Sequence, residues 1–376
     1  MSEQDAWLAL AAAELPPRWT LRLLEELGSP EEVVSASPSG LAGVVRLTPS
    51  ELVRLAEARE RDLAPARRAL EAVGARLVTI RDAEYPANLR EIPDPPAVLF
   101  VRGAFRPEDA RCVAIVGSRR VTPYGKQVAE TLARDLAARG ITVASGMAVG
   151  ADAAAHRGAL ARGGRTIGVL ACGIDVPYPR ETLELREQAA ARGAVISELF
   201  PGTPALRGRF PARNRLISGL ALAVVVTEAA ERSGALITAS WAAEQGRLVF
   251  AVPGSVNSEL SRGTHGLIRD GARLAVSADD IVEELELPAL APSREPAPEP
   301  AAAARPAEAG LEARDPGGLT GDEQAILAAL SLQQKHMDDI INQCRLPSAR
   351  ASAGLLMLEL KGMVRRLPGN MFMRVR

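Results

Sequence analysis

Short apolar runs recur through the middle of the chain, and each of them ends in small or polar residues. Between residues 105 and 287 the runs alternate with segments of helical spacing, at roughly 25 to 30 residues per unit. The apolar runs are 113–116, 142–144, 166–171, 195–196, 223–226 and 249–252. This alternation predicts a doubly wound α/β domain with an extended Rossmann-like parallel sheet, covered by helices on both faces.

The carboxyl ends of the predicted strands carry polar and small residues. Gly117, Ser118 and Arg119 follow the first run, and a serine, glutamate or glycine stands within two residues after each of the others. In an open parallel sheet these ends lie at one edge, and such folds bind ligands there. We therefore expect the functional site at that edge. The segments predicted as intervening helices are 125–139, 152–162, 182–192, 213–220 and 235–245.

Smaller units are predicted on either side of the sheet domain. Residues 1–75 predict four or five short helices, and residues 76–287 hold the sheet domain, opened by an extended proline-rich lead-in. Residues 288–316 contain seven prolines without apolar periodicity, which is typical of a semi-extended linker. Residues 317–376 predict three helices and a hairpin, the pattern of a winged helix.

Arginines gather on two stretches that contain no acid, although the net charge of −1 gives no overall nucleic-acid signal. Residues 199–227 hold four arginines, and residues 110–129 hold three arginines and a lysine. Focused positive charge suits an anionic ligand. Chance clustering is the alternative, because only three of the 45 basic residues are lysine and arginine is the ordinary cation of this chain.

Arg119 is a candidate phosphate ligand because its planar guanidinium donates two parallel hydrogen bonds and stays charged. The backbone N–H groups of Gly117 and Ser118 could form an anion nest beside it. An ordinary tight turn with a solvated arginine is the other interpretation. The second and third glycines of a dinucleotide fingerprint are missing after Gly117, which argues against NAD.

Phe210 is the one aromatic residue in the basic segment 207–215, which we interpret as a loop. Proteins hold single-stranded nucleic acid in this way, with a basic groove along the backbone and aromatic faces that stack on bases. Phe210 would then be a stacking platform. The alternative is a hydrophobic anchor that pins the loop to the domain.

His156 and Asp152 lie four residues apart, on one face of a predicted helix. They could form an acid–base pair, but no nucleophile or metal-ligand partner accompanies them in the sequence. A capping aspartate with a hydrogen-bonded histidine is the commoner arrangement. We therefore interpret both residues as structural, and His265 as a capping residue.

Membrane and disulfide classes are not expected. The apolar run at 7–13 is short and follows acids rather than a basic lead, so it does not predict a secretory signal, and a cytoplasmic protein is the default expectation. Cys112, Cys172 and Cys344 lie far apart, which argues against a disulfide framework or a zinc ribbon. We expect no bound metal.

Several motifs stand in a distinctive order. They are Val113-Ala-Ile-Val-Gly-Ser-Arg119, Ser145-Gly-Met-Ala-x-Gly150-x-Asp152-x-x-x-His156, Tyr178-Pro179, Ser197-Glu198, Phe210-Pro-x-Arg-Asn-Arg215, Ser233-Gly-x-x-x-Thr238-Ala, Pro253-Gly254 and Leu267-Ile-x-x-Gly-Ala272. In order and spacing, residues 80–287 resemble the DNA processing protein A (DprA, also called Smf) family. The flanks resemble that family's helical N-terminal domain, of the SAM or helix-hairpin-helix type, and its C-terminal winged helix.

The resemblance implies a non-enzymatic recombination mediator without a cofactor. Such proteins bind incoming single-stranded DNA in natural transformation and load RecA onto it, displacing or bypassing single-strand-binding protein. The strand-binding residues implied here are Gly117, Ser118, Arg119, Arg207, Phe210, Arg213 and Arg215. The resemblance also implies a homodimer formed through Leu267, Ile268 and Leu274. Val149 stands where the family often has arginine, so one phosphate contact is expected to be lost.

Two other functions remain open. Nucleotide phosphoribohydrolases have a similar doubly wound domain, and Glu198 or Glu228 at the strand ends could then be a catalytic acid. Their Pro-Gly-Gly-x-Gly-Thr loop is absent, since Pro253 and Gly254 are followed by serine. A regulator that binds duplex DNA through the winged helix, with the sheet domain as a ligand sensor, is the second alternative.

Overall fold

The computed structural model describes residues 1–286, 319–331, 334–344, 346–367 and 370–375. The chain forms two units, Met1–Glu295 and Pro296–Arg376. The linker predicted at 288–316 lies outside the described residues. Within the described ranges, no helix has the length and apolar character needed to cross a membrane.

The larger unit is built on a nine-stranded sheet in the order β1-β2-β6-β5-β4-β3-β7-β8-β9. Its strands are β1 (Ala75–Thr79), β2 (Val98–Gly103), β3 (Cys112–Val116), β4 (Thr142–Ser145), β5 (Thr166–Val169), β6 (Ala194–Ser197), β7 (Ala223–Val226), β8 (Leu248–Ala251) and β9 (Arg273–Leu274). The neighbours from β6 to β9 pair in parallel, which confirms the predicted parallel sheet and its six central strands. The lead-in supplies β2 and β1, which extend the sheet in antiparallel pairing beyond β6.

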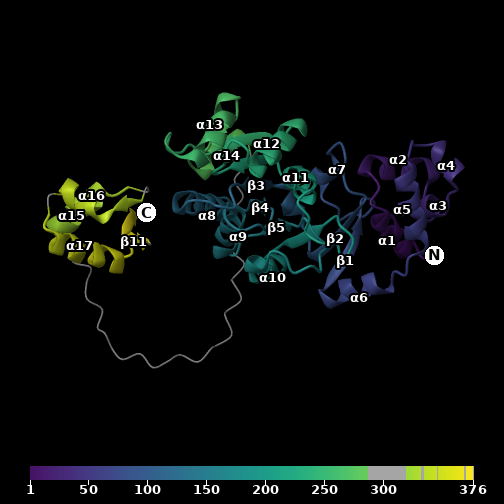
Figure 1. Ribbon diagram of the computed structural model, residues 1–376, viewed down its shortest axis with the longest axis horizontal. Helices are drawn as coiled ribbons and strands as arrows, with labels where there is room; N and C mark the ends of the chain where they lie inside the picture. The colour runs from purple at the N-terminus through teal and green to yellow at the C-terminus, as the bar shows by residue number, and fades with distance from the viewer. Residues whose placement is uncertain (287–318, 332–333, 345, 368–369, 376) are drawn as a thin grey trace, which may run out of the picture. The chain divides into compact units, whose positions relative to one another are not determined.

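Helices cover both faces of this sheet (Figure 1). They are α7 (Ala87–Arg90), α8 (Pro123–Ala138), α9 (Ala151–Ala161), α10 (Leu183–Arg192), α11 (Arg209–Leu220), α12 (Gly234–Glu244), α13 (Arg262–Arg269) and α14 (Ala278–Glu284), with short 3-10 turns η1 (Pro107–Ala110), η2 (Arg180–Thr182) and η3 (Glu259–Ser261). One core cluster joins the sheet to α7, α11 and α12, and another joins it to α8, α9 and α14. Alternate residues of β3 explain the two layers, because Ala114 and Val116 enter the first cluster whereas Val113 and Ile115 enter the second.

The N-terminal region forms six helices, one or two more than predicted. They are α1 (Glu3–Ala13), α2 (Pro17–Leu27), α3 (Pro30–Ser35), α4 (Pro38–Ala42), α5 (Pro49–Glu60) and α6 (Ala64–Ala72). Proline is favoured at a first helical position because its missing N–H would have no partner there, and α2 to α5 all begin with it. Trp7 and Leu23 of these helices share a core cluster with Phe100 of β2 and with Phe200, so the region packs against the β2 side of the sheet.

The smaller unit has the predicted winged-helix elements. They are α15 (Gly321–Ala329), β10 (Lys335–His336), α16 (Met337–Cys344), α17 (Ser348–Leu360), β11 (Val364–Leu367) and β12 (Met371–Arg374). Thr320 and Glu323 form a capping box at the start of α15, with each residue's side chain bonded to the other's backbone N–H. The three strands form a sheet in the order β10-β12-β11 over a core that includes Ile326, Leu355 and Phe372.

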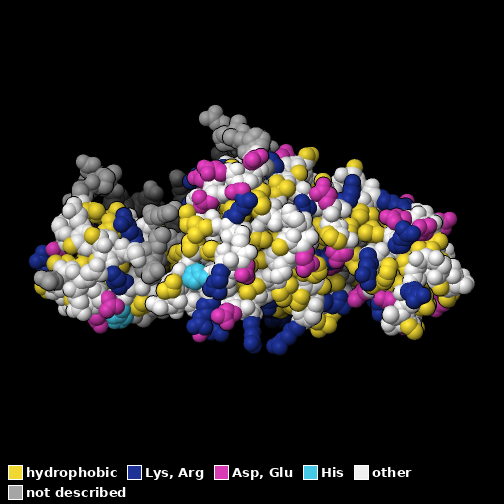
Figure 2. All heavy atoms as spheres, turned by 90° about the horizontal axis from the view of Figure 1, so that it is seen from above, with side chains coloured by type: hydrophobic (Ala, Val, Ile, Leu, Met, Phe, Trp, Pro, Cys, Tyr) yellow, Lys and Arg dark blue, Asp and Glu magenta, His cyan; other side chains and the backbone are white. Residues whose placement is uncertain are grey.

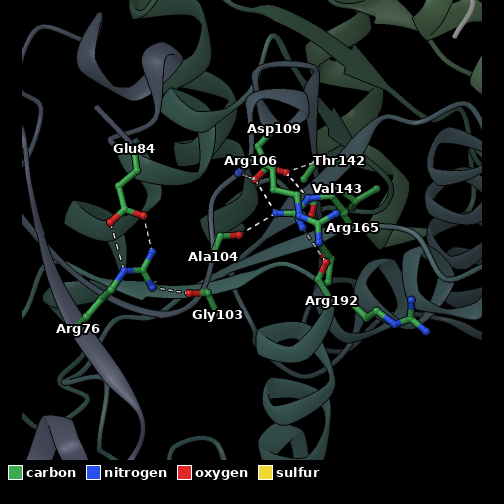
Figure 3. A network of polar contacts seen from close by, with 11 residues as sticks. Arg76, Glu84, Gly103, Ala104, Arg106, Asp109, Thr142, Val143, Arg165 and Arg192 are labelled. Carbon is green, nitrogen blue, oxygen red and sulfur yellow. Dashed lines mark hydrogen bonds and ion pairs between the residues drawn. The ribbon is translucent and has the colours of Figure 1, made fainter. Parts of the chain in front are cut away.

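A buried polar network ties together the amino ends of the central strands (Figure 3). Asp109, which is 7% exposed, accepts hydrogen bonds from the hydroxyl of Thr142 at 2.8 Å and from the guanidinium of Arg165 at 2.8 and 2.7 Å. Arg165 also donates to the carbonyl oxygens of Ala104 and Arg192, at 2.8 and 3.0 Å. This edge is therefore stabilised by charge pairing, opposite to the edge where ligands are expected.

Replacing Asp109 by alanine should destabilise the protein by about 3 kcal/mol, because a largely buried arginine would lose its charged partner. Chemical denaturation followed by circular dichroism measures the free energy of unfolding. Glu84→Ala is the matched control, since the ion pair between Arg76 and Glu84 is about 40% exposed at both side chains and should contribute under about 1 kcal/mol. Equal losses in the two variants would contradict a special role for the buried network.

Candidate functional site

A small pocket of about 40 Å³ opens at the carboxyl ends of β4 and β5, at the edge predicted from the sequence. We call it the edge pocket. Its walls include Arg119, Ala148, Val149, Cys172, Tyr178 and Phe210. These residues come from four loops or helix starts that are far apart in the sequence, so the fold assembles the pocket.

Arg119, Phe210 and Tyr178 form a stack at the mouth of the edge pocket. The guanidinium carbon of Arg119 lies 4.5 Å from the ring centroid of Phe210. The ring of Tyr178, a residue that is 40% exposed, meets Phe210 edge-on at a centroid distance of 6.2 Å. Phe210 is half-buried and belongs to none of the hydrophobic clusters of the described residues. The ring is therefore partly accessible to solvent and contacts Arg119 and Tyr178.

Hydrogen bonds to Glu228 hold the loop after β3 in place. The N–H of Ser118 donates to the carbonyl oxygen of Glu228 at 2.8 Å, and the N–H and hydroxyl of Thr122 donate to the Glu228 carboxylate at 2.8 and 2.6 Å. The prediction of an anion nest at Gly117 and Ser118 is therefore wrong for the Ser118 N–H, which already has an acceptor. Gly117 is required here because a Cβ would lie 2.6 Å from the Thr227 hydroxyl oxygen. The rigid loop presents Arg119, which is exposed, to solvent.

The structure buries Arg213, although this residue was expected on the strand-binding surface. Only 4% of this residue is exposed, and its Nη1 donates to the carbonyl oxygens of Gly146, at 2.7 Å, and of Val169. Burial lowers the pKa of Arg213 to about 10, and the nearby Asp152 carboxylate acts in the opposite direction. Gly146 leaves room for the side chains of Asp152 and Arg213, since a Cβ there would lie 2.6 Å from the carboxylate of Asp152.

Arg215 is also internal, with 5% of the residue exposed. It forms ion pairs with Asp94, at 3.0 Å, and with Glu198. The reason is that α11 begins at Arg209, so the stretch interpreted as a loop is the first turns of a helix packed on the sheet. Arg213 and Arg215 thus support the surface from within and do not face a ligand on it.

Of the remaining arginines of this region, one forms an ion pair with an acid and the others form none with a described acid. Arg209 donates to the Glu14 carboxylate at 3.2 to 3.4 Å, which joins the start of α11 to the N-terminal helices. Arg119, Arg120 and Arg207 are exposed, and none of them has an ion pair with a described acid. Charge is unevenly spread on the larger unit, where lysine and arginine side chains protrude together from the lower rim (Figure 2).

The histidine and acidic candidates are all engaged in internal contacts. Thr166 donates its hydroxyl proton to the carbonyl of Val143 at 2.7 Å, so it accepts the Nδ1 proton of His156 at 2.7 Å. Burial lowers the pKa of this histidine to about 3, which keeps it neutral. Burial raises the pKa of Asp152, which the N–H of Ala148 contacts at 3.4 Å. This geometry agrees with a structural interpretation of both residues.

The two alternative acids and His265 are also engaged in contacts with other residues. Glu198 pairs with Arg215, and Glu228 accepts the bonds from Thr122 described above. His265 contacts the carbonyl oxygen of Gly254 at 3.1 Å. Across the described ranges, no three His, Cys, Asp or Glu side chains gather in a way that could hold a metal ion.

Tyr178 belongs to the Tyr178-Pro179 motif but had no expected role, and the structure brings it against Phe210. The sequence signal that could have found it is an aromatic residue between two prolines, shortly after the end of a predicted strand. The contact itself joins residues 32 positions apart and depends on how the loop after β5 meets α11.

The residues expected to form a dimer interface lie at the β9 end of the sheet. Leu267 and Ile268 belong to α13 and are half-buried, whereas Leu274 in β9 is 49% exposed. Among the described residues, β9 is the last strand of the sheet and pairs with β8 alone, so its other edge has no described partner. Val276 next to it is 59% exposed, which adds to an apolar strip along this edge.

Comparison with known proteins identifies the family. Residues 76–286 match the model of DNA recombination-mediator protein A, and residues 291–370 match the DprA winged helix domain. A DprA from Mycobacterium tuberculosis is 41% identical over 294 residues, which cover 74% of each chain. DprA of Bacillus subtilis is 44% identical over 213 residues, covering 56% of this chain and 72% of the relative.

Solved structures agree with these matches. The crystal structure of DprA from Streptococcus pneumoniae has a TM-score of 0.66 at 34% identity and covers 76% of this chain and 98% of that one. DNA processing protein A from Helicobacter pylori, whose structure concerns its single-stranded DNA binding mode, has a TM-score of 0.50 at 31% identity, covering 56% and 96%. This chain therefore belongs to the DprA/Smf family of DNA recombination-mediator proteins.

Proposed function

We propose that this protein binds single-stranded DNA along the carboxyl edge of its sheet. The stack of Arg119 on Phe210, beside the exposed ring of Tyr178, carries the proposal. A base can stack on an aromatic face whatever its sequence, and an arginine next to that face can pair with the neighbouring phosphate. The Helicobacter pylori relative with a described single-stranded DNA binding mode supports the same ligand class.

Free cations at this edge would follow the backbone of the strand. Arg119, Arg120 and Arg207 are exposed and unpaired with described acids, whereas Arg213 and Arg215 hold the scaffold beneath them. Gly117 and Ser118 contribute by shaping the loop that presents Arg119. The edge pocket is too small to admit a base as it stands, so we place the base against the ring of Phe210 at its mouth.

A single strand should be preferred over a duplex, because only a flexible strand can turn its bases onto Phe210. Phe210→Ala should cost about 1–3 kcal/mol in strand binding. Arg119→Ala should reduce the slope of log affinity against log salt by about 0.7, the value for one phosphate of a single strand. Fluorescence anisotropy at several salt concentrations measures both.

Arg68→Ala is the matched control, since Arg68 is exposed on α6 and should leave the slope and the affinity unchanged. If Phe210→Ala lowers the melting temperature but leaves the affinity intact, the ring is an anchor and the stacking proposal fails. Tighter binding of duplex than of single strands would also contradict the proposal.

We also propose a homodimer that is formed by the apolar strip around Ile268 and Leu274. A twofold axis places the same patch on both subunits, and the open edge of β9 with exposed Leu274 and Val276 suits such a self-complementary contact. Two strand-binding edges would then act together, which raises avidity on long DNA through effective concentration.

Leu274→Glu should convert the dimer to a folded monomer, because it places a charge at a side chain that is already exposed in the single chain. Light scattering gives the mass, and circular dichroism checks the fold. Val53→Glu on α5 is the control, since Val53 is 55% exposed and lies outside the strip. A dimer that survives Leu274→Glu would place the interface elsewhere, as would a wild-type chain that is monomeric.

The mediator role that we propose is the loading of RecA onto the bound strand in natural transformation, with displacement or bypass of single-strand-binding protein. It rests on family membership together with the strand-binding edge, and it requires binding and no covalent chemistry. The protein should shorten the lag of RecA-dependent ATP hydrolysis on strands that are covered by single-strand-binding protein. The Phe210→Ala variant should lose this effect, and an unchanged lag with the wild-type protein would refute the loading role.

A further inference from the structure

Two cations at the two ends of α17 are held by carboxylates of α15. Arg350 donates to both oxygens of Asp322, from Nε and Nη2 at 2.7 Å each. Lys361 Nζ lies 2.9 Å from each oxygen of Glu323. The hydrogen bond from Lys361 and the backbone N–H of Thr320 together hold the pKa of Glu323 below its usual value. Both pairs are neutral overall, so neither cation is left for a phosphate.

Apart from Arg350, the described exposed side chains of α17 are small or apolar. In helix-turn-helix proteins that read DNA, the corresponding helix lies in the major groove. The exposed side chains of α17 include Ala349, Ser352, Ala353, Leu356 and Met357. The preceding helix, α16, opens with exposed Asp338 and Asp339. Among the described residues, the cation beside these helices without an acid partner is Lys335, which is half-buried and donates to the Gln343 side chain at 2.6 Å.

The β11–β12 hairpin, which is the wing, carries exposed positive charge. Arg365, Arg366 and Arg374 are exposed, and none of them forms an ion pair with a described acid. Arg366 donates to the side chain of Asn370 at 3.0 Å and lies 5.9 Å from the ring centroid of Phe372, so its charge remains uncompensated. Residues 361–376 contain five cations and no acid. Among the described residues of this unit, the exposed cations without an acid partner therefore lie on the wing.

We propose that the winged helix binds the phosphodiester backbone of nucleic acid through this hairpin, and that α17 stays out of the groove. Guanidinium groups pair with phosphate oxygens without reading the bases, so the binding is independent of sequence. The surface consists of residues other than those of the sheet's carboxyl edge, and it does not depend on strand binding there. Single strands and duplexes share this backbone chemistry, and the test separates them.

Replacing Arg365 and Arg374 together by glutamine in the full chain removes two phosphate ligands and spares the Arg366 contact with Phe372. The slope of log affinity against log salt should fall by about 1.4 on single strands or by about 1.8 on duplexes, at 0.7 and 0.9 per phosphate. Fluorescence anisotropy with both forms, in mixed and homopolymer sequences, measures the change. The form whose slope changes is the ligand of the wing.

The double variant Arg350→Gln with Lys361→Gln is the matched control, because it removes the same charge from the same unit. It should lower the melting temperature and leave the slope unchanged. The wing variant is also made in the Phe210→Ala background, where its effect should persist even if the sheet's edge proves not to bind strands. An unchanged slope in the wing variant overturns the proposal, and so does an equal change in the control or a dependence on base sequence.

Discussion

The carboxyl edge of the sheet depends on the buried guanidinium of Arg213. Its Nη1 donates to the carbonyl oxygens of Gly146 and Val169, and so it joins α11 to the ends of β4 and β5. A charge that is 4% exposed requires partners, and the nearby Asp152 supplies the opposite charge. This tie determines where the first turn of α11 lies, and with it the position of Phe210.

Phe210 is thereby held on a rigid base while its ring remains accessible. Arg209, just before it, is joined to Glu14 of the N-terminal region, and the loop that carries Arg119 is pinned by Glu228. The two segments that meet in the stack are thus positioned separately before any ligand arrives. Such preorganisation reduces the conformational entropy that the protein loses when a ligand binds.

Both units contain paired and unpaired cations. Some cations on helices are neutralised by acids, as with Arg215 in the larger unit and Arg350 in the smaller one. Arg119 on the loop after β3 and Arg374 on the wing are exposed, and neither forms an ion pair with a described acid. Paired charges contribute to packing, whereas unpaired ones remain available to an anion.

Much of the fold could be predicted from the sequence, because strand and helix periodicity are local properties. The six central strands, the winged helix and its capping box at Thr320 all follow from residues within a few positions of one another. The antiparallel addition of β1 and β2 could not be predicted in this way, since it depends on pairing with β6 about 95 residues later.

The same distinction between local and long-range information applies to the candidate site. The sequence by itself determined that an arginine and an aromatic residue would lie at the carboxyl edge, because strand ends of a parallel sheet share one side. Only the tertiary structure decided which arginines are buried, since α11 is enclosed on all sides from Arg213 onward and its arginines meet carbonyls and carboxylates contributed by distant segments. Whether a charge is free depends on neighbours that the chain brings together only when it folds.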